Sequence, residues 1–207
     1  MPPILHLEKI LNSPPEDAFA ISREHSAGFT PRHYRDSADI LPWLRLRTLA
    51  FAKERPGLAQ WTERDFEREF LAKPWWSPTR MWLVEDFTPG GGAPVLVGAV
   101  CLAERGATTH DPLPGQSISG GGMIPDARSA PGGGDAVLPL SVIHWLMVHP
   151  GYRRRGLGEW LIHVLEQAVW DSGGRTIHLE THAGWSAAVR LYTRLGYSPV
   201  ASTSGAG

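Results

Sequence analysis

The pattern of hydrophobic and polar residues is clearest in the C-terminal third of the chain. An apolar run over residues 138–149 predicts a strand, and residues 157–170 repeat apolar side chains at helical spacing. A second strand is expected over 176–181, a second helix over 186–195 that ends at Gly196, and a short last strand over 197–200. The apolar face of the first helix consists of Leu157, Leu161, Val164, Leu165 and Ala168.

The pattern is weaker in the N-terminal half. Residues 1–28 show no persistent periodicity, so we expect a loosely ordered N-terminal arm. Residues 29–35 predict a short strand, and a helix follows that ends at Pro56 and Gly57, because neither residue continues a helix. The residues expected on its apolar face are Leu41, Leu44, Leu46, Leu49 and Phe51.

The pattern then predicts a second helix and a hairpin. The sequence of residues 62–65 is typical of a capped helix start, with Phe66, Phe70 and Leu71 facing inward. Two strands are expected over 81–85 and 95–103, joined by a turn rich in glycine.

Glycine, proline, serine and threonine dominate residues 105–135. A loop of this length is rare inside a compact domain, which favours either a flexible insertion or a neutral linker. Residues 29–200 would then form a single domain, followed by a disordered tail over 201–207.

Composition narrows the class of protein. A length of 207 residues suits one domain with a full core, and a net charge of −1 argues against a general nucleic-acid binder. Cys101 is the only cysteine and lies in an apolar run, which favours a buried thiol in a reducing compartment. The N-terminus lacks the order of a signal peptide, and the longest apolar run is too short to span a bilayer. We therefore expect a cytoplasmic protein with no membrane partner.

The junction between the predicted strand and helix at residues 148–158 is the strongest candidate for chemistry. A turn rich in glycine and arginine that opens a helix offers backbone N–H groups to a phosphate. A dinucleotide fingerprint beginning at Gly156 and Gly158, with Glu180 on the ribose, is one interpretation. However, Leu161 occupies the place of its third glycine, and too few residues follow Glu180 to complete such a fold.

Two motifs point elsewhere. Arg153-x-x-Gly156-x-Gly158 is followed, at a helix end, by Leu191-Tyr192-x-x-x-Gly196-Tyr197. Together, in this order and spacing, they resemble the signature of the GNAT superfamily of N-acetyltransferases, over about residues 140–200. The resemblance implies an α/β fold of the α+β kind: a central mixed, mostly antiparallel sheet, flanked by helices, with one splayed pair of strands.

The resemblance also implies a cofactor site. Acetyl-CoA would be the donor, with no metal required, and its pyrophosphate would lie on backbone amides at the start of the helix. The backbone N–H of Val148 would bind the acetyl carbonyl. The cofactor-binding residues implied in this way are Met147, Val148, Arg153, Arg154, Arg155, Gly156, Leu157, Gly158 and Glu159.

Three residues are candidates for proton transfer. Tyr192 matches the general acid of the family, although a core tyrosine would show the same pattern. His144 takes the place where many members carry a glutamate base, and a satisfied core histidine is an equal alternative. Glu180 or His182 would be the base otherwise, unless Glu180 simply pairs with an arginine. One departure from the family pattern is Trp185, which stands where many members have asparagine.

These expectations define a function. We expect transfer of acetyl from acetyl-CoA to a primary amine of a small molecule or peptide, with a homodimer left open. Trp61, Trp75 and Trp76 are candidates for an aromatic wall around the acceptor, or are packing residues. The alternatives are a non-catalytic acyl-CoA-binding module and, from the dinucleotide interpretation, a nicotinamide-dependent oxidoreductase.

Overall fold

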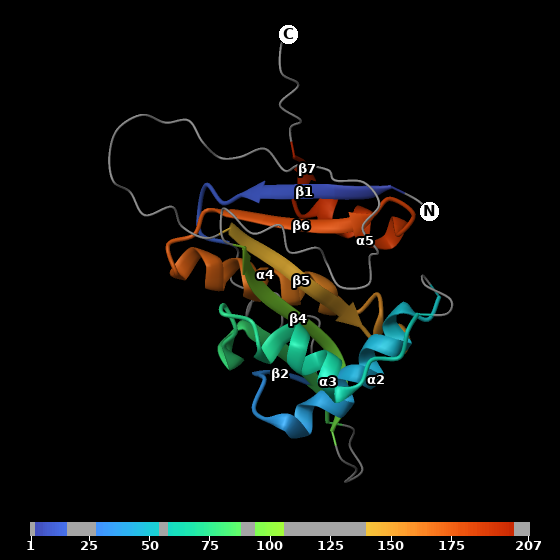
Figure 1. Ribbon diagram of the computed structural model, residues 1–207. Coiled ribbons are helices and arrows are strands. Elements are labelled where there is room, and N and C mark those ends of the chain that lie inside the picture. The colour runs from blue at the N-terminus through green and yellow to red at the C-terminus, as the bar shows by residue number, and fades with distance from the viewer. Residues whose placement is uncertain (1–2, 16–27, 54–57, 88–93, 106–139, 201–207) are drawn as a thin grey trace.

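The fold is built on one mixed sheet of seven strands (Figure 1). The computed structural model describes residues 3–15, 28–53, 58–87, 94–105 and 140–200. The strand order is β2-β3-β4-β5-β6-β1-β7. The strands are β1 (Ile4–Ile10), β2 (Phe29–His33), β3 (Met81–Asp86), β4 (Val95–Arg105), β5 (Leu140–Val148), β6 (Thr176–His182) and β7 (Ser198–Pro199).

The sheet is antiparallel at every pair of neighbours except one. Strands β5 and β6 run parallel, and the other five pairs run antiparallel. The predicted hairpin is confirmed as β3 and β4. The mixed, mostly antiparallel α/β architecture implied by the sequence resemblance is therefore confirmed.

Helices cover both faces of the sheet. The α-helices are α2 (Ile40–Phe51), α3 (Glu63–Phe66), α4 (Leu157–Asp171) and α5 (Ser186–Arg194). The π-helix η2 (Glu67–Leu71) continues α3, and the short 3-10 helices are η1 (Ser37–Asp39), η3 (Pro78–Arg80) and η4 (Pro150–Tyr152). Helices α2 and α3 lie in front of the sheet in Figure 1, and α4 lies behind it. Each face has its own hydrophobic core.

Helix α4 packs on the rear face of the sheet, against β4 and β5. Its predicted apolar face is confirmed at Leu157, Leu161 and Leu165, which are buried, whereas Val164 and Ala168 are partly buried. The backbone of β4 comes close to the helix at Gly98, where an added Cβ would lie 3.2 Å from Leu161 Cδ1. The close contact at Gly98 places α4 directly against the backbone of β4.

The predicted face of α2 was partly wrong. Leu41 and Leu49 are 51% and 47% exposed, whereas Trp43 is buried, together with Leu44 and Leu46. The capped start of α3 is confirmed, because the Thr62 side chain accepts from the Asp65 N–H and the Asp65 side chain accepts from the Thr62 N–H. The residues predicted to face inward after it divide: Phe66 and Phe70 are buried, and Leu71 is exposed.

The expectation of a loose arm over residues 1–28 fails for its first part. Strand β1 pairs with β6 over seven residue pairs, from Ile4↔His182 to Ile10↔Thr176, and also carries β7 at its other edge. The side chain of Leu7 is buried in the rear core. The globular part of the chain therefore begins near residue 4 rather than near residue 29, because the sheet needs β1 to cover β6.

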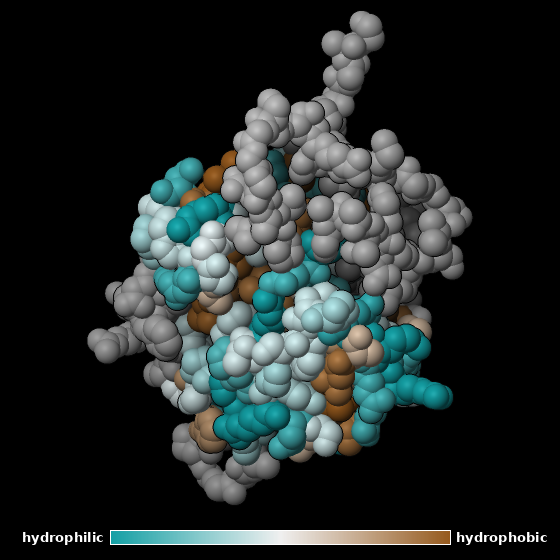
Figure 2. Space-filling view, turned by 60° about the vertical axis from the view of Figure 1, so that its left-hand side comes forward, coloured by the Kyte–Doolittle hydropathy of each residue, from teal (hydrophilic) through white to brown (hydrophobic). Residues whose placement is uncertain are grey.

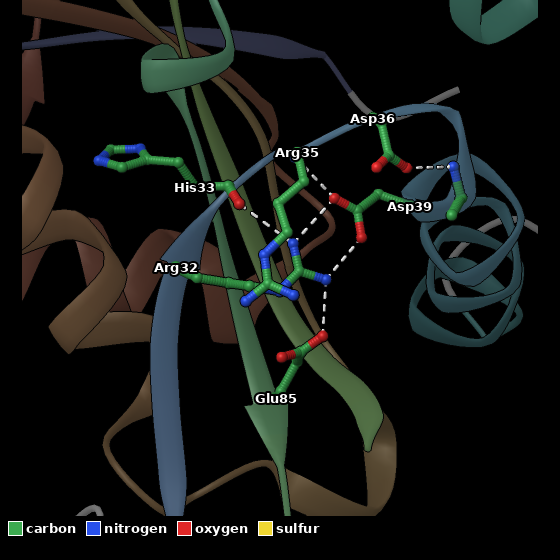
Figure 3. A network of polar contacts seen from close by, with 7 residues as sticks. Arg32, His33, Arg35, Asp36, Asp39 and Glu85 are labelled. Carbon is green, nitrogen blue, oxygen red and sulfur yellow. Dashed lines mark hydrogen bonds and ion pairs between the residues drawn. The ribbon is translucent and has the colours of Figure 1, made fainter. Parts of the chain in front are cut away.

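A charged network ties β2 to the start of α2 (Figure 3). The Arg32 guanidinium donates to both carboxylate oxygens of Asp39, at 2.8 and 2.5 Å, and to Glu85 Oε1 at 2.6 Å. The Arg35 backbone N–H also donates to Asp39. Burial alone would raise the pKa of Asp39, but these hydrogen bonds outweigh it and hold the pKa below its usual value.

Several expectations fall outside the described residues. These are the insertion over residues 105–135, of which only Arg105 is described, and the tail over 201–207. The helix that was expected to end at Pro56 and Gly57 ends earlier, because α2 stops at Phe51. Within the described part of the chain, no helix is both long and apolar enough to cross a membrane. Where Figure 2 is coloured, hydrophobic residues reach the surface only in separate small patches among hydrophilic ones.

Candidate functional site

The sheet opens where β5 and β6 separate. Their ladder consists of two pairs among the described residues, Ser141↔Ile177 and Val142↔His178. Beyond them both strands run on, to Val148 and His182. A cavity of about 1100 Å³ occupies this region, lined by both strands, the turn after β5 and the start of α5. This is the splayed pair that the resemblance implied.

The end of β5 directs a backbone N–H group toward the open side. His149 N–H donates to the Val97 carbonyl at 2.8 Å, next to the cross-strand pair Gly98↔Val148. In an antiparallel ladder this places Gly98 and Val148 in a pair that is not hydrogen-bonded. The N–H of Val148 therefore points away from β4, toward the side where β6 has separated.

The turn that follows has the geometry of an anion site. Arg154 and Gly156 adopt positive φ angles of 64° and 75°, which turn the chain into α4 at Leu157. The first N–H groups of a helix have no partner within it, and the helix dipole is positive there. Gly158, in the first turn of α4, lies close to α5, because an added Cβ would lie 3.3 Å from Leu191 Cδ2.

Basic side chains surround the turn in different ways. Arg153 lies along the backbone, donating to the Val148 carbonyl at 3.4 Å and to the Ala50 carbonyl at 2.5 Å. Arg154 lines the cavity, as does Arg194, which pairs with Glu159 at 2.7 Å. Of the residues named by the resemblance for the cofactor, all line the cavity except Arg155, whose guanidinium lies over the Tyr152 ring at 5.1 Å.

Tyr192 lines the same cavity from α5. Its side chain is 6% exposed, and its ring packs edge-on against Tyr197 with centroids 5.7 Å apart. Burial raises the pKa of the Tyr192 phenol well above its ordinary value. The hydroxyl therefore stays protonated throughout the neutral range and is available only as a proton donor.

His144 also lines the cavity, but it is held by a residue that the sequence did not indicate. Its Nε2 lies 2.8 Å from Oε1 of Glu69, and both side chains are buried. Glu69 belongs to η2 and is 75 positions away in sequence. No local spacing joins the two residues, since only the packing of η2 on β5 brings them together.

Glu180 occupies the opposite wall, on β6. Its carboxylate accepts from Arg105 Nη1 at 3.1 Å and lies 3.6 Å from His6 Nδ1. The pairing with an arginine that the sequence allowed is therefore observed. His182, two residues further along, has a buried Nδ1 with no hydrogen-bond partner among the residues that the structure describes, and its ring packs 4.7 Å from the Trp185 ring.

The aromatic residues at the cavity differ from those expected. Trp61, Trp75 and Trp76 pack against the front core and are absent from the described lining of the cavity. Phe51 and two other tryptophans take that place, with ring centroids 5.7 Å apart for Phe51–Trp145 and 5.5 Å for Phe51–Trp185. Trp145 belongs to an apolar run that predicts a regular strand. Its φ of 53° departs from that regular strand, and its side chain lines the cavity.

Among the residues that the structure describes, no group of three or more His, Cys, Asp or Glu side chains is placed to hold a metal ion. Cys101 is buried, as expected from its apolar surroundings, and burial raises the pKa of its thiol.

Comparisons with known proteins agree with this geometry. No curated protein matches the chain by sequence. Among solved structures, a GCN5-related N-acetyltransferase from Sphaerobacter thermophilus has a TM-score of 0.63 at 17% identity, over 95% of this chain and 48% of that one. A glucosamine N-acetyltransferase region of a fungal multi-domain β-N-acetylglucosaminidase has a TM-score of 0.57 at 9% identity, over 95% of this chain and 20% of that one. This chain thus spans about half of the first protein and a fifth of the second.

A third similar structure is that of the aminoglycoside N-acetyltransferase AAC(6')-Iy in complex with CoA, with a TM-score of 0.51 at 17% identity, over 84% of this chain and 90% of that one. At these identities the three structures show a shared fold. The sequence profile of the Acetyltransferase (GNAT) family matches residues 43–197, which is more than half of the chain. The chain therefore belongs to the acetyltransferase (GNAT) family.

Proposed function

We propose that the protein transfers an acetyl group from acetyl-CoA to a primary amine, in the cavity between β5 and β6. One observation carries the proposal. The two parallel strands separate after Val142 and His178, and the opening leads directly to the anion-binding turn at the start of α4. A thioester on an extended arm fits such an opening, with its phosphates at the turn.

The turn would hold the pyrophosphate through its backbone. The N–H groups of residues 154–159 supply the hydrogen bonds, and the positive end of α4 adds a favourable field. Arg154 and Lys53 line the cavity and add positive charge. The AAC(6')-Iy complex, which has the same fold, contains CoA and supports this choice of donor.

The chemistry would then proceed by direct attack in a ternary complex. The amine nitrogen bonds to the acetyl carbon, and the Val148 N–H stabilises the negative charge that develops on the carbonyl oxygen. As the carbon–sulfur bond breaks, Tyr192 donates its proton to the leaving thiolate. His144 accepts the proton that the attacking amine loses, directly or through water. The products are the acetylated amine and free CoA.

The lining of the cavity favours a particular kind of acceptor. Phe51, Trp145 and Trp185 present aromatic rings to it. Glu180, a carboxylate in the lining, is already paired with Arg105. Aromatic surface binds apolar and cationic groups. We therefore expect a primary amine with an apolar or flat body, rather than a polyamine that needs several carboxylates.

An acetyl-transfer assay tests the proposal. Acetyl-CoA is mixed with a panel of arylalkylamines, polyamines, aminoglycosides and peptides, and release of free thiol is followed together with the mass of the acetylated product. The proposal expects turnover that depends on the amine and is fastest for arylalkylamines. Tight binding of CoA without turnover on any amine would instead favour a non-catalytic acyl-CoA-binding module.

A further inference from the structure

Glu69 is a buried carboxylate that forms hydrogen bonds with two consecutive residues of β5. Its side chain is 5% exposed, and one oxygen, Oε1, lies 2.8 Å from His144 Nε2 and 3.2 Å from Trp145 Nε1. It comes from the π-helix η2, on the front face of the sheet. Burying a carboxylate is unfavourable in free energy unless hydrogen bonds compensate for its lost hydration. The two hydrogen bonds of Glu69 are therefore important for its burial.

The strand is distorted so that both contacts form. Consecutive residues of a regular strand point to opposite faces, so His144 and Trp145 would not normally reach one carboxylate oxygen. Trp145 adopts a φ of 53°, which is rare for a bulky residue, and the β4–β5 register shifts between Ala99 and Cys101. Backbone strain of this kind persists only where the surroundings hold it, and the Glu69 carboxylate supplies one such hold.

The contacts also determine which nitrogen of His144 carries the proton. An indole N–H is only a donor, and an ionised carboxylate is only an acceptor. Glu69 therefore accepts from both residues, which requires a proton on Nε2 of His144. The lone pair of the neutral ring is then on Nδ1.

We propose that Glu69 is a positioning residue for acetyl transfer: it holds His144 as the Nε2–H tautomer, so that Nδ1 accepts the proton of the acceptor amine, and it stabilises the imidazolium that results. The inference rests on the proposed function of the cavity. It assigns a role in the reaction to a residue that touches neither acetyl-CoA nor the amine. A carboxylate that orients a histidine base in this way also strengthens it.

The other charged and titratable groups around His144 are accounted for. From β4 the group opposite is Cys101, whose thiol stays neutral because burial raises its pKa. From η3, Arg80 approaches Cys101 and is paired with Glu104. The His144 ring also contacts the rings of Phe70, Trp75 and Trp145, and from α2 the Arg47 guanidinium lies 5.1 Å from the Trp145 ring. Glu69 is thus the anionic partner of His144 in the described part of the chain.

The test compares Glu69→Gln with wild type in two independent measurements. Long-range ¹H–¹⁵N NMR of the histidine rings reports the tautomer, with the His144 signal identified by its loss in His144→Gln. Glutamine keeps the size of the side chain but carries no charge, and its amide can present either its oxygen or its NH₂ group to Nε2, so the preference for the Nε2–H tautomer is weakened. We expect the His144 signal to change from Nε2–H to a mixture with Nδ1–H, without any need for substrate.

The second measurement is the pH dependence of kcat/KM with a primary amine and acetyl-CoA. In Glu69→Gln we expect kcat to fall about tenfold or more, with KM for acetyl-CoA little changed. The acidic limb moves to lower pH, because the imidazolium has lost its anionic partner and deprotonates more readily. Glu67→Gln, an exposed change in the same π-helix, is the matched control and should behave as wild type.

Several outcomes separate the alternatives. A Glu69→Gln protein that keeps the Nε2–H tautomer and turns over within about twofold of wild type overturns the inference. A lower melting temperature with an unmoved acidic limb would show a purely structural role and overturns it too. If wild type acetylates no amine, the proposed function fails and the role in proton transfer fails with it, whereas the tautomer comparison still decides whether Glu69 orients His144.

Discussion

At the scale of single residues, the reactivity of Tyr192 depends on where it is buried. The ring packs in the rear core against Tyr197, and its edge reaches the cavity between β5 and β6. Burial raises the pKa of the phenol, so the group stays protonated at neutral pH. In the proposed reaction it would give its proton to the sulfur as negative charge develops there during cleavage of the carbon–sulfur bond.

Tyr192→Phe tests this role. The change removes one oxygen and keeps the ring, so folding and binding of acetyl-CoA should be retained. We expect kcat to fall about 100-fold, the usual scale for loss of a general acid. Tyr34→Phe, a buried tyrosine in the front core, serves as the control and should keep wild-type turnover. Full turnover of Tyr192→Phe at saturating substrate would remove the assignment.

Sequence reasoning reached only some of the residues at the site. Tyr192 and Gly156 could be named because their motifs are local and their spacing is short. Glu69 and Phe51 could not, because they reach the cavity region from the opposite face of the sheet, through tertiary packing. Trp145 was hidden for another reason: an apolar residue in a strand pattern gives no sign of a bulge.

At the scale of elements, β1 carries more of the fold than its sequence suggested. It lies between β6 and β7 and is the only described partner of each strand at that edge. Leu7→Ala should lower the free energy of unfolding by about 2–5 kcal/mol, because Leu7 is 3% exposed and a cavity would remain. Ile10→Ala, at a position on the same strand that is 60% exposed, should cost about 0.5 kcal/mol or less.

Denaturant unfolding of the two variants decides the matter. Equal and small losses of unfolding free energy would mean that β1 is only loosely attached, which is what the lack of periodicity in residues 1–28 predicts. A large loss for Leu7→Ala alone would establish β1 as part of the folded unit.

The Arg32 network gives a second prediction at this scale, with a pH dependence. Arg32→Met leaves Asp39 and Glu85 buried without their cation, and at neutral pH we expect a loss of about 3 kcal/mol. The pKa of Asp39 is lowered in the folded state, so its contribution is present above the unfolded pKa of about 3.9 and is lost as the pH falls below it. The difference between wild type and Arg32→Met should therefore shrink in acid.

Denaturant unfolding at pH 7 and pH 3 measures this difference. Arg68→Met is the control, because Arg68 is exposed and its pair with Asp65 lies on the surface. A gap between wild type and Arg32→Met that is as large at pH 3 as at pH 7 would show that the network stabilises by packing rather than by charge.

The helices show why pattern succeeds or fails. Helix α4 repeats Leu157, Leu161 and Leu165 at helical spacing, so periodicity located its buried face, although His163 and Glu166 are buried beside them. Helix α2 buries Ile40, Trp43 and Ala50 together with Arg47, whose guanidinium lies 4.1 Å from the Trp61 ring and 5.1 Å from the Trp145 ring. Because the charged residue Arg47 occupies a buried position, the pattern of apolar residues indicated a face that includes Leu41 and Leu49, which are exposed. The pairing of β1 with β6 could not be predicted either, because it joins opposite ends of the chain.

At the scale of the whole molecule, the cavity is lined by elements from both faces of the sheet. Helix α2 contributes from the front core, and α5 and the start of α4 contribute from the rear core. The rear core continues across the opening, because one cluster joins α4 with residues of β3, β4 and β5 on one side and of β6 and β1 on the other. The proposed acyl-donor site would thus be built from elements on both faces of the sheet.

Gly158→Val tests whether the turn binds the donor. The new Cβ meets Leu191 Cδ2 at 3.3 Å, and the branched side chain would press on the first turn of α4. We expect CoA to bind at least about tenfold more weakly, which is about 1.4 kcal/mol. Gly151→Ala is the control, because its Cβ would make ordinary contact with the His149 ring at 3.4 Å. Calorimetric titration measures the affinity of both variants for CoA. Equal affinities would contradict binding of CoA at the first turn of α4.

Hydrogen–deuterium exchange with and without CoA tests the central claim most directly, because it reports where the cofactor lies without depending on the acceptor. CoA should slow exchange in peptides that cover residues 142–160 and 182–192, where β5, the turn and α5 line the cavity. Peptides from β2 and β3 should exchange as before. Slower exchange elsewhere, with residues 142–160 unchanged at saturating CoA, would contradict the account.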